Sequence, residues 1–311
     1  MTTPVGSVGP APSASGRGWR QGEARTAWLL SAPALLGLAA FVVAPFVLAV
    51  VFSFTNQRLI SPLPTRFIGI DNYLSTFGDP AFWRGFVNNV IFVVIVVPVQ
   101  TGLALFLAVL VNSKVRGRVA FRTVYFMPVV TVMATAAVTW TLLLNPSGLV
   151  NAVMGVLSAG TFSPDWLGST TYALPAIMLV SIWQGTGFQM IILLAALQDV
   201  PEELYEAAEL DGAGAWRKFR SVTLPGIRNG LIFVVTVTTI LAFRLFDQVW
   251  IMPQIPGGPL DSTRTMMLHL VETGFGEQAI GRASAVAVIF FVLVLVVTLV
   301  QRRFIREEAG G

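Results

Sequence analysis

Six long apolar runs are the feature that most constrains how this chain can fold. They cover residues 28–53, 87–111, 122–144, 172–197, 229–251 and 283–304. A helix needs roughly 20 apolar residues to cross the hydrocarbon core of a bilayer, and each run is long enough. A helix also satisfies its backbone hydrogen bonds within its own segment, as lipid requires. The runs therefore predict an all-α integral membrane protein with six transmembrane helices.

The composition supports this fold class and excludes others. The chain is 55% hydrophobic and 12% charged, whereas soluble domains are about a quarter charged, so a lipid bilayer must cover much of it. The basic residues lie at the ends of the apolar runs and form no single patch, so we expect no nucleic-acid partner. With no cysteine and one histidine, His269, we expect no metal site, and we place His269 at the surface of an external loop.

The distribution of lysine and arginine orients the chain. Fourteen of the 20 basic residues lie before the first run, in the second and fourth connections, and after the last run. The positive-inside rule makes these regions cytoplasmic, and six spans also require both termini to share one side. Connections 145–171 and 252–282 then face outside, and each contains a short apolar piece that predicts a surface helix. The residues leave open whether these helices shield a cavity mouth or simply lie in the interface.

This pattern divides the chain into three regions. Residues 1–25 are rich in Pro, Gly, Ser and Thr and predict a disordered cytoplasmic tail. Residues 26–306 form the six-helix domain, and residues 307–311 form a C-terminal cytoplasmic tail. The first run is longer than the apolar core of a signal peptide, so we expect a retained span.

The fourth connection carries a charged island, "EELYEAAELDGAGAWRKF". Pro201 suits the first turn of a helix over residues 202–210, and Gly212 can take the positive φ that ends it. A second short helix follows, with Trp216 and Phe219 apolar among basic neighbours. This predicts a cytoplasmic helix–turn–helix whose mixed charges and exposed aromatic rings are typical of a docking site for a soluble partner.

The spacing within this island resembles that of a known family. Glu206-Ala207-Ala208, three residues, Gly212, nine residues, Val222, one residue and Leu224-Pro225 resemble the EAA loop of ABC importer permeases, with Val222 in place of isoleucine. In that family the loop forms coupling helices that sit in a groove of the ATPase subunit. The resemblance implies the type I ABC importer permease fold, N-in and C-in, with loop 199–226 as the coupling loop. The implied coupling residues are Glu203, Glu206, Ala207, Ala208, Asp211, Gly212, Leu224 and Pro225. The alternative is a loop that packs only on its own bundle.

Four further stretches are similar to the carbohydrate-uptake branch of these permeases, which includes maltose-type and glycerol-3-phosphate-type members. They cover residues 67–92, 121–130, 242–250 and 257–275. The resemblance implies a permease subunit in the bacterial plasma membrane that imports a sugar or sugar derivative by alternating access. The implied partners are a second homologous permease, an ABC ATPase dimer and an extracytoplasmic substrate-binding protein. ATP and Mg would bind the ATPase subunits, since this chain has no G-x-x-x-x-G-K-[ST] motif, and we expect no cofactor or catalytic residue in it.

Polar residues within the fourth run predict part of a substrate site, because polar groups are costly in a bilayer. Gln184 and Gln189 can bond sugar hydroxyls, and Trp183 can stack on a sugar ring. By resemblance, the positions that match the sugar site of a maltose-type permease are Ser181, Gln184, Gly185 and Phe188. The alternative for the glycines at 185 and 187 is that they only allow tight helix packing.

The fifth run contains Arg244 and Asp247, whose spacing predicts that they share one helix face. Either they pair with each other, or Arg244 faces the cavity and meets hydroxyls or an anionic group of the substrate. Arg244 also matches a substrate-contacting position of the resembled family, although its residue type differs, so the identity of the sugar stays open. Thr131 and Thr135 on one face of the third run are further candidates, unless they bond only their own backbone.

Two other classes of function fit the sequence less well. A self-sufficient secondary transporter of a small polar solute needs intramembrane carboxylates for ion coupling, and the runs offer only Asp247. An intramembrane enzyme needs a nucleophile–base pair or a metal constellation, which one external histidine and no cysteine do not provide. We therefore expect a translocation subunit that is not itself an enzyme.

Overall fold

The computed structural model of the chain describes residues 17–61, 64–112 and 118–307. These residues are predominantly helical, and the only β-type pairing among them is a bridge between Thr55 and Phe67. The all-α prediction is therefore confirmed for the described residues. The chain divides into two compact units, residues 1–51 and 52–311.

The described part of the first unit, residues 17–51, is one continuous helical segment. It contains α1 (Arg17–Leu38), a π-helical turn (Ala39–Val43) and the start of α2 (Ala44–Phe52). Pro45 has no amide hydrogen to bond residue 41, and the ladder widens here, with the Ala44 amide donating to the Ala39 carbonyl. Residues 17–25, which were predicted to belong to the tail, are helical in the described chain. Residues 1–16 and 308–311 of the predicted tails lie outside the described residues.

The second unit contains the remaining apolar runs. Its long helices are α4 (Pro80–Asn112), α8 (Ala173–Gln198), α12 (Arg228–Phe243) with α13 (Asp247–Ile251), and α15 (Ile280–Glu307). The third run forms two helices, α5 (Arg118–Val130) and α6 (Met133–Leu143), bent by 98°. Among the described residues, five helices are long and apolar enough to span a bilayer, or six if the bent pair is one span.

The bend in the third run corrects the expectation of one straight helix. It lies at Thr131 and Val132, where the Val132 backbone is extended with a ψ of 132°. Pro128 precedes the break, and its carbonyl accepts the Thr131 amide in a tight turn. A proline within a helix removes one hydrogen bond and clashes with the preceding turn, which weakens the helix at this point.

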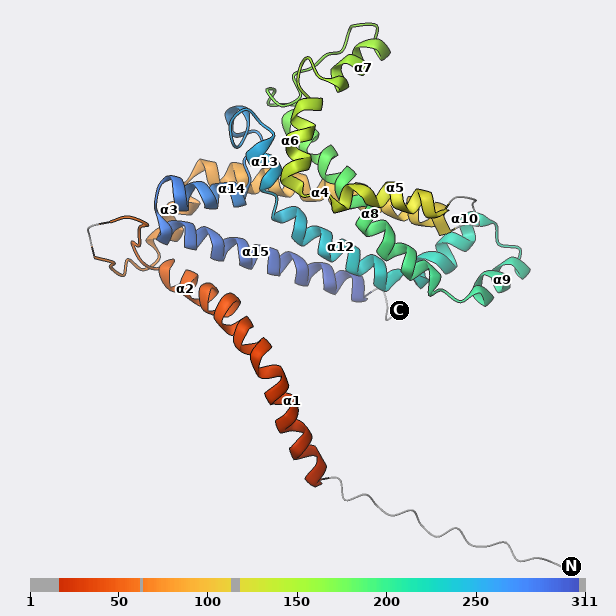
Figure 1. The fold of residues 1–311 in the computed structure, drawn as a ribbon, viewed down its shortest axis with the longest axis horizontal. Helices are drawn as coiled ribbons and strands as arrows, with labels where there is room; N and C mark the ends of the chain where they lie inside the picture. The colour runs from red at the N-terminus through yellow and green to blue at the C-terminus, as the bar shows by residue number, and fades with distance from the viewer. Residues whose placement is uncertain (1–16, 62–63, 113–117, 308–311) are drawn as a thin grey trace, which may run out of the picture. The chain divides into compact units, whose positions relative to one another are not determined.

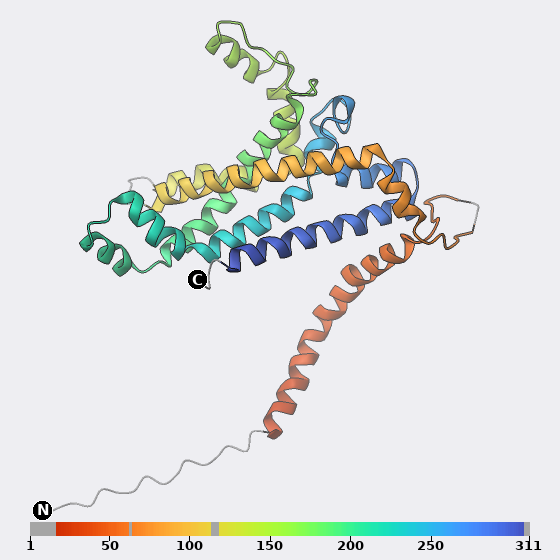
Figure 2. The same ribbon diagram turned by 180° about the vertical axis from the view of Figure 1, so that it is seen from behind.

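Shorter elements connect the spans. They are α3 (Asp71–Phe77), α7 (Leu149–Leu157), α9 (Glu202–Leu210), α10 (Ala215–Lys218), a π-turn (Phe219–Thr223), α11 (Leu224–Gly226), a 3₁₀ turn (Pro259–Asp261), α14 (Met266–Val271) and a second π-turn (Glu272–Gly276). The two predicted external helices are thus present as α7 and α14. Both views show α9 and α10 at the end of the bundle where α4 finishes, with α3 and α14 at the opposite end (Figures 1 and 2).

The core of this unit lies where α4, α8 and α12 pack together. One apolar cluster includes Phe92, Ile177 and Val180, and a second, nearer to the coupling loop, includes Met190 and Ile227. A third contact is made by α5, which crosses α8 at Gly187. A Cβ atom at Gly187 would lie 2.1 Å from the Tyr125 carbonyl oxygen, so glycine is required for this close approach. Gly187 therefore serves helix packing.

The prediction that His269 lies at the surface is wrong. His269 in α14 is 2% exposed, and its ring makes an edge contact with Phe82, with 6.1 Å between the centroids. Its Nε2 atom lies 3.9 Å from Asp79 Oδ2, and Asp79 also forms an ion pair with Arg282 of α15. The external segment is buried here because α14 packs against α4 and α15, which a reading of one loop in isolation does not reveal.

Candidate functional site

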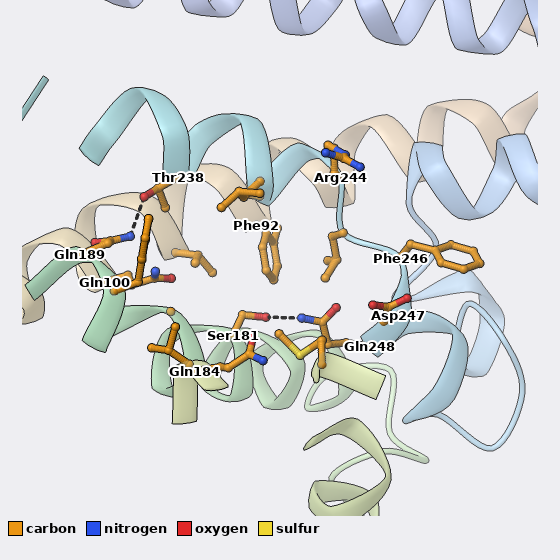
Figure 3. A pocket seen from close by; sticks show the side chains of 18 of the residues that line it. Phe92, Gln100, Ser181, Gln184, Gln189, Thr238, Arg244, Phe246, Asp247 and Gln248 are labelled. Atoms are coloured by element: carbon orange, nitrogen blue, oxygen red, sulfur yellow. Dashed lines mark hydrogen bonds between the residues drawn. The ribbon is translucent and has the colours of Figure 1, made fainter. Parts of the chain in front are cut away.

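A cavity of about 540 Å³ lies among α4, α5, α6, α8 and the α12–α13 segment (Figure 3). It brings together seven of the nine predicted substrate residues. These are Ser181, Gln184, Gly185, Phe188, Gln189, Arg244 and Asp247. The fourth and fifth runs, which are separated by the whole coupling loop in sequence, therefore meet at one site.

The polar side chains of α8 are held by specific partners. The Gln184 amide donates to the Thr131 carbonyl at 2.9 Å, which satisfies an oxygen at the α5–α6 break. Ser181 Oγ accepts from Gln248 Nε2 at 3.2 Å, and the Gln189 amide donates to Thr238 Oγ1 (Figure 3). The Oε1 atom of Gln189 is buried without a hydrogen-bond partner in the described chain. That oxygen offers an acceptor for a donor group such as a hydroxyl.

Gly185 and Gly187 lie two residues apart on α8 but differ in role. A Cβ atom at Gly185 would lie 2.2 Å from Nε2 of Gln100, a residue of α4 that also lines the cavity. The missing side chain thus leaves space for a polar group of the neighbouring helix. Gln100 is not among the predicted site residues, although a glutamine in an apolar run two residues after Pro98 was an available signal.

The α12–α13 break supplies the charged groups of the cavity. Helix α12 ends at Phe243, and Phe246 has φ −139° and ψ −59°, so residues 244–246 are not helical. The prediction that Arg244 and Asp247 share one helix face is therefore wrong. Among the described ion pairs none joins these two residues, and both side chains are exposed in the isolated chain. The interpretation in which Arg244 faces the cavity is the one that the geometry favours.

Thr131 and Thr135 do not line this cavity. They cannot share one helix face, because Thr131 lies in the break and α6 begins only at Met133. Thr131 contributes through its carbonyl group, which accepts from Gln184, and the Thr135 carbonyl accepts from Thr139 Oγ1. Besides Gln100, the cavity residues that sequence reasoning missed include Thr238, Phe246 and Gln248.

The charged island folds as predicted, into α9, a turn and α10. Gly212 has a φ of +73°, and the Ala213 amide donates to the Ala208 carbonyl at 2.9 Å, which closes the end of α9. Lys218 Nζ lies 3.3 Å from Glu209 Oε2 and links the two helices. The loop presents an apolar surface, with Leu210 91% and Trp216 74% exposed.

The predicted coupling residues occupy different parts of this loop. The exposed ones are Glu203, Glu206, Ala207, Asp211, Gly212 and Pro225. Ala208 is half-buried, and Leu224 packs against the second apolar cluster of the bundle. Leu224 thus joins the loop to its own core, whereas the exposed set is accessible to another protein.

Comparison with known proteins identifies the family of this chain. Residues 73–308 match the model of the binding-protein-dependent transport system inner membrane component. The sulfoquinovosyl glycerol transport system permease protein SmoG of Agrobacterium fabrum is 35% identical over 288 residues, which cover 92% of each chain. The trehalose/maltose transport system permease protein MalF of Thermococcus litoralis is 33% identical over 281 residues, 89% of this chain and 92% of that protein.

A solved structure shares the fold. The crystal structure of a bacterial alginate ABC transporter, in complex with an alginate pentasaccharide-bound periplasmic protein, contains a chain with a TM-score of 0.80 at 20% identity. The match covers 94% of this chain and 99% of that one. With its several apolar helices the present chain is a multi-pass membrane protein, and it belongs to the family of binding-protein-dependent transport system inner membrane components.

Proposed function

We propose that this chain is the permease subunit of an ATP-driven, binding-protein-dependent importer for a sugar or sugar derivative. The observation that carries the proposal is the arrangement of α8. Its middle lines the cavity with Ser181 and Gln184, and its end at Gln198 leads after three residues into α9 of the exposed loop. A movement imposed on the loop therefore has a short path to the cavity wall.

The lining of the cavity supports a carbohydrate as the cargo. Amide groups, two hydroxyls, a guanidinium and a carboxylate provide donors and acceptors for several hydroxyls of a sugar, and Phe92 and Phe188 offer apolar faces to a ring. Curated relatives named for sulfoquinovosyl glycerol, lactose and trehalose/maltose transport agree with this class. The choice among a neutral sugar, a polyol and an anionic sugar depends on what Arg244 meets.

The partners follow from the same proposal. An ATPase dimer docks on the exposed residues of α9 and α10 and hydrolyses ATP with Mg, a second homologous permease completes the pathway, and an extracytoplasmic binding protein delivers the sugar. A soluble ATPase partner explains why Leu204, Leu210 and Trp216 are exposed on a charged loop. In alternating access, closure of the ATPases would move α9 and rock the helices around the cavity.

A charge reversal on the loop tests the docking. Glu206→Lys places a cation on the exposed face of α9, where we expect an anion to meet a basic residue of the ATPase. We expect loss of sugar uptake and of ATPase co-purification, with normal amounts of the chain in the membrane. Asp71→Lys, the same charge reversal at an exposed residue of α3 at the opposite end of the bundle, is the matched control and should leave co-purification intact.

Uptake by Glu206→Lys at the wild-type rate would refute the docking assignment. The alternative function, a self-sufficient secondary transporter, predicts that the chain reconstituted alone takes up solute without any ATPase. Uptake by that preparation, driven by an ion gradient, would favour the alternative.

A further inference from the structure

Two fully buried side chains hold the break between α12 and α13. Asn89 Nδ2 of α4 donates to the Phe243 carbonyl at 3.1 Å, and Thr265 Oγ1 donates to the Leu245 carbonyl at 2.9 Å. Both residues are 0% exposed. A helix broken within a membrane span frees backbone carbonyls that lipid cannot satisfy, so side chains of the protein must do so.

The same two residues also hold the start of α14 on the external side. Asn89 Oδ1 accepts from the Met266 amide at 2.8 Å, and Thr265 Oγ1 accepts from the Leu268 amide at 3.2 Å as the cap of α14. The Asn89 carboxamide thus uses its donor on the break and its acceptor on α14. No apolar residue and no carboxylate offers this combination.

Gly85, one turn before Asn89, makes this bridge possible. A Cβ atom at Gly85 would lie 2.9 Å from the carbonyl carbon of Thr265. Helix α4 therefore approaches the backbone before α14 closely, and the short side chain of Asn89 can reach both the Met266 amide and the Phe243 carbonyl.

The break that Asn89 holds forms one wall of the cavity. All five consecutive residues from Arg244 to Gln248 line it, including both of its charged side chains. We propose that Asn89 is a positioning residue of the substrate cavity, which fixes Arg244 and Asp247 and ties their position to α14 on the external side. The role in substrate handling rests on the proposed function, whereas the positioning itself does not.

Asn88 provides a matched control. It is the neighbouring residue on α4, is half-buried, and also donates to backbone carbonyls, those of Asp261 at 3.2 Å and Arg264 at 2.9 Å. Its partners lie in the external loop before α14 and not in the break. Asn88→Ala and Asn89→Ala therefore remove the same chemical group from adjacent positions, and only the second should affect the cavity wall.

The absence of cysteine from the chain allows a direct measurement. Spin labels attached at Val129→Cys and Phe246→Cys, on two walls of the cavity, report the distance between α5 and the break in the full chain in lipid nanodiscs. We expect one narrow distance distribution, which Asn89→Ala broadens or shifts and Asn88→Ala leaves unchanged. A distribution for Asn89→Ala that equals that of the otherwise unaltered labelled chain would overturn the proposal.

Thr265 gives a second, independent test should Asn89→Ala fail to fold. Thr265→Val keeps the shape but removes both hydrogen bonds of the hydroxyl, and Thr265→Ser keeps them. We expect the valine variant to broaden the distance distribution and the serine variant to retain the narrow one. Identical narrow distributions for the two variants would contradict the proposal.

A functional measurement separates this inference from the proposed function. In the assembled transporter, Asn89→Ala should lower the ATPase stimulation by sugar-loaded binding protein about tenfold, the scale expected for one lost buried hydrogen-bonding group. Asn88→Ala, whose partners lie outside the break, should leave this stimulation unchanged. A broadened distance with no sugar stimulation in any variant would refute the sugar importer and leave the positioning role standing, whereas full stimulation in Asn89→Ala would refute that role.

Discussion

Arg244 is the residue whose surroundings say most about the cargo. It lines the cavity, none of the described ion pairs joins it to Asp247, and an unpaired charge within a membrane span costs roughly 2.5–3.5 kcal/mol on insertion scales. A substrate group that accepts from the guanidinium offsets this cost. We expect Arg244→Ala to reduce sugar-stimulated ATPase activity about tenfold, and Arg244→Lys, which keeps the charge but not the planar fork, to reduce it less.

The control for Arg244 is Arg58→Ala, since Arg58 is exposed outside the spans and does not line the cavity. Its removal should leave the stimulation unchanged. If Arg244→Ala also showed the wild-type level of sugar-stimulated ATPase activity, Arg244 would be a structural residue. The amide side chains alone would then indicate the kind of substrate.

His269 makes the external corner of the bundle sensitive to pH. Burial lowers the pKa of His269 below its ordinary value of 6.5; Asp79 opposes this shift, and Arg264 and Arg282 add to it. Above pH 6.5 the imidazole is neutral in both the folded and the unfolded chain, so it adds no pH dependence. Below pH 6.5 the unfolded chain binds a proton that the folded chain does not, and stability falls until the lowered folded pKa is reached.

The measurement is the thermal unfolding midpoint of the detergent-solubilised chain at pH 7.5 and pH 5.5. We expect the midpoint to fall on acidification, and to fall less in His269→Gln, which cannot titrate. Burial raises the pKa of Asp79, but the Ala81 amide, His269 and Arg282 together lower it by a larger amount, so the pKa of Asp79 lies below 3.8. Asp79 therefore does not titrate in this interval, and equal decreases in both proteins would contradict the assignment to His269.

At the scale of the element, the packing of α5 on α8 depends on Gly187. A methyl group there would lie 2.1 Å from the Tyr125 carbonyl oxygen, and backbone cannot move aside as a side chain tip can. Gly187→Ala should destabilise the chain by about 1–3 kcal/mol, the usual cost of overpacking. The thermal unfolding midpoint measures this, with Gly102→Ala in α4 as control, because nothing lies within 4 Å of a Cβ atom at that position. Equal midpoints for Gly187→Ala and Gly102→Ala would show that α5 can move away from α8 at little cost in stability, and would contradict this prediction.

The apolar runs predicted where the spans lie, but not which of them are broken. The length and hydrophobicity of a run indicate that the segment lies in lipid. They are the same whether the helix is straight or bent, so they do not reveal a break. The bend at Thr131 is stabilised by Gln184 of α8, and the break after Phe243 by Asn89 of α4. These partners lie 53 and 154 positions away in the sequence, so local pattern could not identify them.

The coupling loop was predictable for the opposite reason. Its turn depends on Gly212, and the bonds that close α9 are made within a few residues, such as that from Ala213 to Ala208. Local chemistry alone therefore specifies the shape of this element. Of the seven cavity residues that were identified, Gln184, Gln189, Arg244 and Asp247 are polar groups within apolar runs, where their cost marks them, and Phe188 followed only from the family resemblance. Thr238 was missed because a threonine can also satisfy its hydroxyl on its own helix.

At the scale of the whole molecule, one helix joins the two functional surfaces. Helix α8 carries cavity residues at its middle and ends at Gln198, where Val200 packs so closely on Gly226 that a Cβ atom there would lie 2.7 Å from the valine. Val200 and Leu224 of the loop also pack against the apolar cluster that contains Leu197 of α8 and Val234 of α12, and both of these helices reach the cavity. We expect a displacement of α9 to reach Gln184 and Arg244 by this route, because only residues 199–201 separate α8 from α9.

That transmission requires the loop and the external corner to lie on opposite sides of the membrane. The chain has no cysteine, so Leu210→Cys at the loop and Leu260→Cys in the external connection, 91% and 84% exposed, each provide a single reactive thiol. A membrane-impermeant maleimide should label position 260 but not 210 in intact cells, and position 210 but not 260 in inverted vesicles, while a permeant maleimide labels both. Labelling of position 210 from outside would place the loop out of reach of any cytoplasmic ATPase, and the docking of α9 and α10 would then be impossible whatever their shape.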